Sequence, residues 1–153
     1  VGQNIGANKI RRIKTGLRAT MKMSGGITIA TTLIIVIWGH LIMSLFTNDA
    51  EVIRIGDQYL TIVSIFYLFF TLMFIYTGIM RGAGDTLIPM FFTLISLWLI
   101  RIPLAYLLSK HIGVQGIWWS IPAGWFVGLA FAFLYYKTGR WKTKAVVKFD
   151  DND

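Results

Sequence analysis

Gly25–Phe46 reads GGITIATTLIIVIWGHLIMSLF and contains no Asp, Glu, Lys or Arg. Three further apolar stretches follow, at Tyr59–Met80, Thr86–Ser109 and Gly116–Tyr136, and the only charged side chain within them is Arg101. A helix that crosses the hydrocarbon core of a bilayer needs about 20 residues, because each residue adds about 1.5 Å. Each stretch is long enough, so the sequence predicts an all-α, polytopic membrane protein with four transmembrane helices.

The composition agrees with a membrane protein. Hydrophobic residues make up 56% of the chain and charged residues 14%, and the mean hydropathy of +0.64 is high for a soluble domain. The net charge of +8 could suit nucleic acid, but the basic residues adjoin the apolar stretches, where anionic lipid headgroups attract them. We therefore expect a lipid bilayer, and no nucleic acid, as the partner of this chain.

The basic residues also predict the orientation in the membrane. One alternating set of connections contains Lys9, Arg11, Arg12, Lys14, Arg18, Lys22, Arg81, Lys137, Arg140, Lys142, Lys144 and Lys148. The other connections contain only Arg54 and Lys110. Because cytoplasmic loops carry the excess of Lys and Arg, both ends of this chain are predicted to be cytoplasmic. The protein is predicted to be multi-pass in the cell (plasma or inner) membrane.

The chain divides into three predicted regions. Residues 1–24 form a cytoplasmic loop, residues 25–136 the transmembrane part, and residues 137–153 a basic cytoplasmic tail with an acidic end. Apolar residues at helical spacing, from Ile10 to Met21, predict an amphipathic helix that lies in the membrane interface and then turns into the first span. A mobile linker and a lipid-surface anchor are both open interpretations. Since the chain opens without Met or a signal peptide, we expect it to begin inside a longer protein.

Two connections carry signals for helix ends. The run Thr47–Asp49 offers caps for the next helix, which we expect to run unbroken from about Ala50 through the second span. The connection after that span is rich in glycine, which permits a tight turn. Asp85 or Thr86 is expected to cap the third span.

Five short motifs occur in order along the chain. They are Gly2–Asn8 (GQNIGAN), Phe46–Asp49 (FTND), Arg81–Thr86 (RGAGDT), Arg101–Tyr106 (RIPLAY) and Gly113–Trp118 (GVQGIW). Together they resemble the multidrug and toxic compound extrusion (MATE) family of transporters, over nearly the whole chain up to about Trp141. The loop residues that match the family's motifs are Gly2, Gln3, Gly6, Ala7, Arg81, Gly82, Gly84 and Asp85.

The resemblance implies a fold of twelve helices in two lobes of six around a central cavity. This chain would be similar to the last four helices of the second lobe. The resemblance also implies secondary active export of cationic or amphipathic compounds in exchange for Na⁺ or H⁺, with the remaining helices of the same transporter as partners and no cofactor. Some members have a carboxylate in the helix that matches the second span, but Tyr59–Met80 contains no Asp or Glu. We therefore expect no coupling-cation site in this chain, and we expect Asp57, just outside that span, to be a solvated surface charge.

Arg101 is the sharpest single feature of the predicted spans. An arginine near the centre of a membrane helix costs about 2.5–3.5 kcal/mol, so its side chain should not face lipid. We expect it to meet a carboxylate, backbone carbonyls or a water-filled cavity, and Pro103 frees a carbonyl nearby because it lacks an N–H. Two interpretations are open: Arg101 organises the outer mouth or pathway of the second lobe, or it locks two helices together or extends to the interface. Direct contact with a cationic substrate is disfavoured, because the charges repel.

Polar residues form stripes on two of the spans. They are Ser64, Tyr67 and Thr71 on the second span and Thr28, Thr31 and Thr32 on the first. Such side chains can line a wet cavity or bond the carbonyls of the preceding turn. With Arg101 and Pro103, the stripe on the second span makes up the predicted transport pathway.

No catalytic constellation and no metal-ligand spacing is evident, so neither an enzyme nor a metal site is predicted. The run Gly82–Gly84 joins two spans rather than opening a βαβ unit, so it is not a nucleotide loop. Two alternatives to a drug exporter are open. They are a lipid-linked oligosaccharide flippase of the same superfamily and a non-transporting four-helix membrane subunit.

Overall fold

The computed structural model describes residues 1–144, and every regular element in that range is a helix. In chain order the elements are α1 (Gly2–Gly6), α2 (Ile10–Ser44), α3 (Ala50–Ile65), α4 (Tyr67–Gly82), α5 (Leu87–Leu94), the π-helical η1 (Ile95–Ile100), α6 (Arg101–Ile112), α7 (Val114–Thr138) and the 3₁₀-helical η2 (Arg140–Thr143). The predicted all-α fold is confirmed. The end of the predicted tail, residues 145–153, lies outside the described residues.

The lengths and compositions of the helices fit a membrane-spanning protein. α2, α7 and the run Leu87–Ile112, which α5, η1 and α6 form together, are each long and apolar enough to cross a bilayer. The consecutive helices α3 and α4 pass the same test as a pair, which gives up to four spans. Large apolar side chains such as Ile37, Leu99 and Leu134 are exposed on these helices, and lipid tails are as apolar as leucine. The prediction of a polytopic membrane protein is confirmed.

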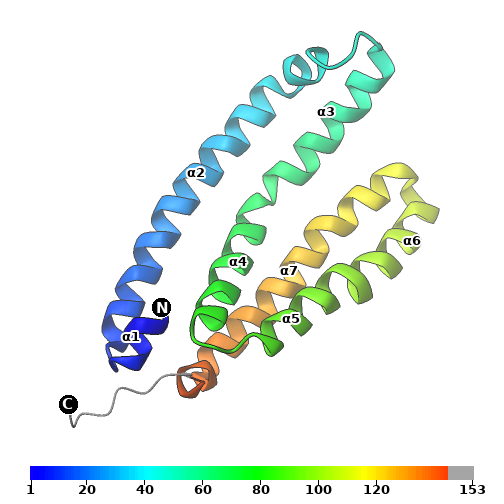
Figure 1. Ribbon diagram of the computed structural model, residues 1–153. Coiled ribbons are helices and arrows are strands. Elements are labelled where there is room, and N and C mark those ends of the chain that lie inside the picture. The colour runs from blue at the N-terminus through cyan, green and yellow to red at the C-terminus, as the bar shows by residue number, and fades with distance from the viewer. Residues whose placement is uncertain (145–153) are drawn as a thin grey trace.

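The helices run alternately up and down the molecule (Figure 1). α2 and α3 are joined at one end, whereas α1, the connection from α4 to α5, and the end of α7 lie at the opposite end. A buried core at that opposite end contains Ile5, Ile13, Met80, Ala132 and Trp141. α1 and η2 therefore lie at the same end, as an even number of crossings requires. That this end is cytoplasmic stays a prediction.

α2 differs from the expectation for the first 24 residues. The sequence predicts a separate interfacial helix and a turn before the first span, but the structure has one unbroken helix from Ile10 to Ser44. The predicted turn is therefore wrong. The reason is packing, because Ile13 is buried in one core with Ile5 of α1 and Ile79 of α4. The apolar face that the sequence predicts to lie in the lipid interface contacts protein instead.

The second span is bent where the sequence predicts an unbroken helix. Asp49 caps its start as expected, because its carboxylate accepts hydrogen bonds from the backbone N–H groups of Glu51 (2.9 Å) and Val52 (3.2 Å). At Phe66, however, α3 ends and α4 begins at an angle of 47°. Just before this break the hydroxyl of Thr32 in α2 donates a hydrogen bond of 2.9 Å to the carbonyl of Ser64. A side chain that enters the backbone ladder in this way is a recognised cause of helix kinks.

The third span contains a π-helical turn, η1, directly before Arg101. Pro103 has no N–H to offer the carbonyl four residues earlier, so the ladder changes its spacing in this region. η1 is fixed to α7, since the buried hydroxyl of Ser96 donates a short hydrogen bond to the carbonyl of Gly124. Glycine is needed at position 124, because a Cβ there would lie 2.9 Å from the carbonyl oxygen of Ser96.

Candidate functional site

A cavity of about 470 Å³ lies among α2, α3, α4, α6 and α7. Its lining combines apolar side chains, aromatic rings, threonine hydroxyls and one charge. The residues are Ile27, Thr28, Thr31, Tyr59, Val63, Tyr67, Phe70, Thr71, Arg101, Ile121 and Trp125. We call this space the inter-helix cavity. All four long helical segments contribute to it, so it is the place where the fold brings residues from distant parts of the sequence together.

The two polar stripes predicted from the sequence face each other. The hydroxyls of Thr28 and Thr71 are 2.9 Å apart and hydrogen-bonded, and both residues line the inter-helix cavity together with Tyr67. Ser64 does not share this position. It is fully buried, and its hydroxyl donates to the carbonyl of Thr61 (3.4 Å). The structure therefore places Tyr67 and Thr71 at the cavity and Ser64 within the protein interior.

Arg101 forms part of the wall of the inter-helix cavity and also borders a second cavity, of about 450 Å³. That second cavity is lined by Trp98, Ile102 and Ser120, among others. Within residues 1–144 no hydrogen bond or ion pair holds the half-buried Arg101 side chain. Of the three environments expected for it, the geometry provides a cavity. Pro103 is exposed and lines neither of these two cavities.

Aromatic rings form one side of the inter-helix cavity. The ring centroid of Trp125 lies 6.0 Å from that of Tyr67 and 4.9 Å from that of Phe70. Sequence reasoning did not single out Trp125. A signal was available, because Trp125 lies near the middle of Gly116–Tyr136, too deep for the interfacial belt where tryptophan is otherwise common. Flat rings at this depth can contact amphipathic molecules and, through cation–π attraction, organic cations.

Two of the motifs, Gly2–Asn8 and Arg81–Thr86, meet at the end of the bundle that holds α1, away from the inter-helix cavity. Gly2 of α1 lies against the end of α4, since a Cβ at Gly2 would be 3.0 Å from the carbonyl oxygen of Gly82. Gly6 is half-buried, whereas the side chains of Gln3, Ala7 and Arg81 are exposed. The contact between two separate motifs indicates that they stabilise this end of the molecule.

Asp85 has a different role from the predicted helix cap. Its side chain is 5% exposed and accepts a hydrogen bond of 2.6 Å from the hydroxyl of Tyr135 in α7. α5 begins after Thr86 without a side-chain cap, so the prediction that Asp85 or Thr86 caps the third span is wrong. The turn that brings Asp85 inward uses Gly84 with φ = 94°, a conformation that favours glycine. Asp85 thus links the α4–α5 connection to α7.

Asp57 is not the solvated surface charge that the sequence suggests. It lies on α3 and is half-buried. Its Oδ1 packs so closely against Gly39 of α2 that a Cβ added at Gly39 would clash with it. The carboxylate therefore lies in a helix interface, outside the inter-helix cavity.

Comparisons with known proteins agree on one family. The MatE family model matches residues 1–107. The probable multidrug resistance protein YpnP of Bacillus subtilis is 34% identical over 141 residues, which cover 92% of this chain and 32% of that protein. The probable multidrug resistance protein NorM of Thermotoga maritima is 30% identical over 117 residues, covering 75% of this chain and 25% of that protein.

A human protein shows the same similarity. Multidrug and toxin extrusion protein 2 of Homo sapiens is 27% identical over 147 residues, which cover 95% of this chain and 24% of that protein. The chain spans at most about a third of the length of these relatives. The matched residues therefore correspond to one part of a longer protein in each of them.

Proposed function

The chain belongs to the MATE family, and on this premise we propose that it forms part of a secondary active transporter that exports cationic or amphipathic compounds in exchange for Na⁺ or H⁺. Members of this family are transporters rather than enzymes. The observation that carries the proposal is the inter-helix cavity, in which aromatic rings and hydroxyl groups from separate membrane helices surround one space. The names of the bacterial relatives, which refer to multidrug resistance, support the same assignment.

In this proposal the cavity binds part of an amphipathic substrate. The rings of Tyr67, Phe70 and Trp125 offer a flat apolar surface that accepts compounds of varied structure. Arg101 would repel the cationic end of a substrate, so that end points toward the aromatic side. In this role Arg101 orients the substrate without binding it directly, and its charge keeps water at the part of the cavity wall that it forms.

Ion coupling is proposed to use residues outside this chain. The second span contains no Asp or Glu, and among the described residues that line the inter-helix cavity Arg101 is the only one that is charged. Na⁺ and H⁺ both require acceptor groups such as carboxylates. The remaining helices of the same transporter are the proposed source of those groups.

One observation favours a second candidate function. A cavity whose charge is a single arginine attracts anions, which suits a flippase for lipid-linked oligosaccharides with their phosphate groups. Translocation of a fluorescent lipid-linked oligosaccharide in vesicles separates the two functions. The flippase requires this translocation, whereas the exporter moves organic cations and leaves the lipid-linked sugar in its leaflet.

Export by the complete transporter polypeptide tests the proposal. In cells without their own efflux pumps, it should lower the accumulation of a fluorescent organic cation, and an imposed gradient of Na⁺ or of H⁺ should drive this export in vesicles. If neither gradient drives export of any cationic or amphipathic probe, the proposed function is wrong.

Variants of the cavity wall sharpen the test. Arg101→Ala should lower the export rate by about tenfold, equivalent to about 1.4 kcal/mol, at an unchanged protein level in the membrane. Trp125→Ala should weaken the apparent affinity for aromatic cations by about 2- to 30-fold, as loss of a cation–π contact predicts. Lys110→Ala is the matched control for charge, because Lys110 also lies on α6 but outside the inter-helix cavity. Normal export by Arg101→Ala would assign Arg101 a packing role only.

A further inference from the structure

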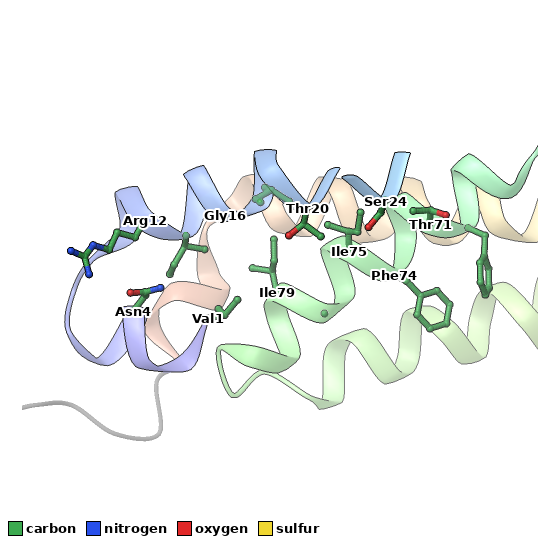
Figure 2. A pocket seen from close by; sticks show the side chains of 14 residues that line it. Val1, Asn4, Arg12, Gly16, Thr20, Ser24, Thr71, Phe74, Ile75 and Ile79 are labelled. Carbon is green, nitrogen blue, oxygen red and sulfur yellow. The ribbon is translucent and has the colours of Figure 1, made fainter. Parts of the chain in front are cut away.

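A larger cavity, of about 660 Å³, lies between α1, α2 and α4 (Figure 2). We call it the α1–α2–α4 groove. It adjoins the inter-helix cavity only at Phe70 and Thr71, which line both spaces. The proposed export function does not account for this groove, so the chemistry of its lining has to indicate what it binds.

The groove is charged at one end and mainly apolar along its length, where three residues with hydroxyl groups also line it. Arg12 and Asn4 stand at the end beside the α1–α2 connection, and the guanidinium of Arg12 points outward there (Figure 2). Farther in, Ile75 and Phe74 of α4 line the opposite wall, and Phe74 remains 47% exposed although it is a large apolar ring. A ligand that matches this pattern has a charged head and an apolar body.

The length of the groove is close to the depth of one lipid leaflet. It extends along α2 from Arg12 to Ser24, and the rise over these twelve positions is about 18 Å at about 1.5 Å each. Half of a hydrocarbon core measures about 15 Å. A lipid acyl chain is much thinner than a helix, which is about 10 Å across. The length of the groove therefore fits one acyl chain.

The charge around the groove selects for an anion. The first 48 residues contain no Asp or Glu, and their basic residues are Lys9, Arg11, Arg12, Lys14, Arg18 and Lys22. An organic cation is repelled from this end, whereas a phosphate is attracted by the surrounding charge. The guanidinium of Arg12 can also bind a phosphate through two parallel hydrogen bonds.

We propose that the α1–α2–α4 groove binds one anionic phospholipid, whose phosphate contacts Arg12 and Asn4 and whose acyl chain lies along Ile75 and Phe74. The site is independent of the export function, since the groove lies mainly outside the inter-helix cavity and needs no transported substrate. Its occupant lies along the groove between α2 and α4, beside the core that already joins these helices.

Two glycines in the groove allow a direct test. Gly16 of α2 and Gly78 of α4 line it, and a Cβ added at either position meets no atom within 4 Å. Gly16→Leu and Gly78→Leu should therefore fold and fill the groove from opposite walls. Gly26→Leu is the matched control, because Gly26 lies on α2, also has open space around it, and does not line the groove. For the charge, Arg12→Gln is compared with Arg11→Gln, since the neighbouring Arg11 is exposed and lies outside the groove.

The measurement is native mass spectrometry of the delipidated, complete transporter polypeptide with added dioleoyl phosphatidylglycerol or dioleoyl phosphatidylcholine. The wild type should retain one phosphatidylglycerol in preference to phosphatidylcholine. Arg12→Gln should weaken this binding by about fivefold, the effect expected for one basic residue, and Arg11→Gln should leave it within about twofold. Both groove-filling variants should abolish the retained lipid, and Gly26→Leu should keep it.

Three results would overturn the proposal. Equal losses in Arg11→Gln and Arg12→Gln would show diffuse attraction to the basic surface in place of a site. Wild-type binding by Gly16→Leu and Gly78→Leu would place the lipid elsewhere. Absence of a retained phosphatidylglycerol in the wild type would mean that another part of the polypeptide covers the groove.

Discussion

At the scale of single residues, the hydrogen bond from Tyr135 to Asp85 joins α7 to the α4–α5 connection. Tyr135→Phe removes the hydroxyl that donates to this buried carboxylate, and the shape of the side chain at position 135 stays nearly unchanged. An unsatisfied buried acceptor costs about 1–3 kcal/mol, so the variant should unfold at a lower temperature. Thermal unfolding of the purified protein in detergent measures the loss.

Tyr136→Phe is the control for this prediction. Tyr136 lies next in the chain and stacks on Trp141 at a ring-centroid distance of 5.3 Å, and within residues 1–144 its hydroxyl has no hydrogen bond. Equal unfolding temperatures for both variants would show that the Tyr135–Asp85 bond does not stabilise the fold.

The candidate site could be predicted from the sequence only in part. Arg101, Tyr67 and Thr71 stand out because they are polar within apolar stretches, and the structure places all three at the inter-helix cavity. Ser64 belongs to the same stripe but points into the interior, since the bend beside it changes the direction of the helix. Trp125 does not stand out in the same way, because it is an apolar residue within an apolar stretch. Which apolar residues face a cavity depends on the packing of other helices, which periodicity does not encode.

At the scale of elements, the bend between α3 and α4 depends on α2. Thr32→Val keeps the shape of the side chain but removes the hydroxyl that donates to the Ser64 carbonyl. We expect the 47° bend to open, because the carbonyl regains its place in the helical ladder. Spin labels at the exposed residues Arg54 and Arg81 should move apart, as pulsed electron spin resonance can measure.

Thr31→Val serves as the comparison for the bend. Thr31 is adjacent and chemically identical, and within residues 1–144 its hydroxyl has no hydrogen-bond partner. The label distance should stay at its wild-type value in that variant. An unchanged distance in Thr32→Val would mean that packing around Phe66, and not the Thr32 hydroxyl, sets the bend.

The elements were predictable where their cause is local. Apolar length predicts the spans, and Asp49 caps α3 as its position suggests. The break at Phe66 was not predictable, since neither proline nor glycine lies there and the hydrogen bond responsible comes from a residue more than thirty positions earlier. The continuity of α2 was missed for a similar reason, because Ile13 has a buried site on α1 and α4 that only the folded chain provides.

At the scale of the whole molecule, the chain spans at most about a third of its relatives. Residues 1–153 expressed alone should insert into the membrane with both ends cytoplasmic but should confer no drug resistance, because an alternating-access transporter needs both halves around its site. Labelling of single cysteines introduced near each end, in intact and permeabilised cells, measures the orientation. Robust resistance from residues 1–153 alone would contradict this prediction.

The buried core around Ile5, Ile13 and Trp141 also has a mechanical consequence. It ties the helices together at one extremity, so that extremity acts as a fulcrum and the long helices act as levers. α2 contains 35 residues, and a lever of about 52 Å that tilts by about 10° moves its tip by about 9 Å. A tilt of about 10° at the fulcrum is thereby amplified into a displacement close to a helix diameter at the far end.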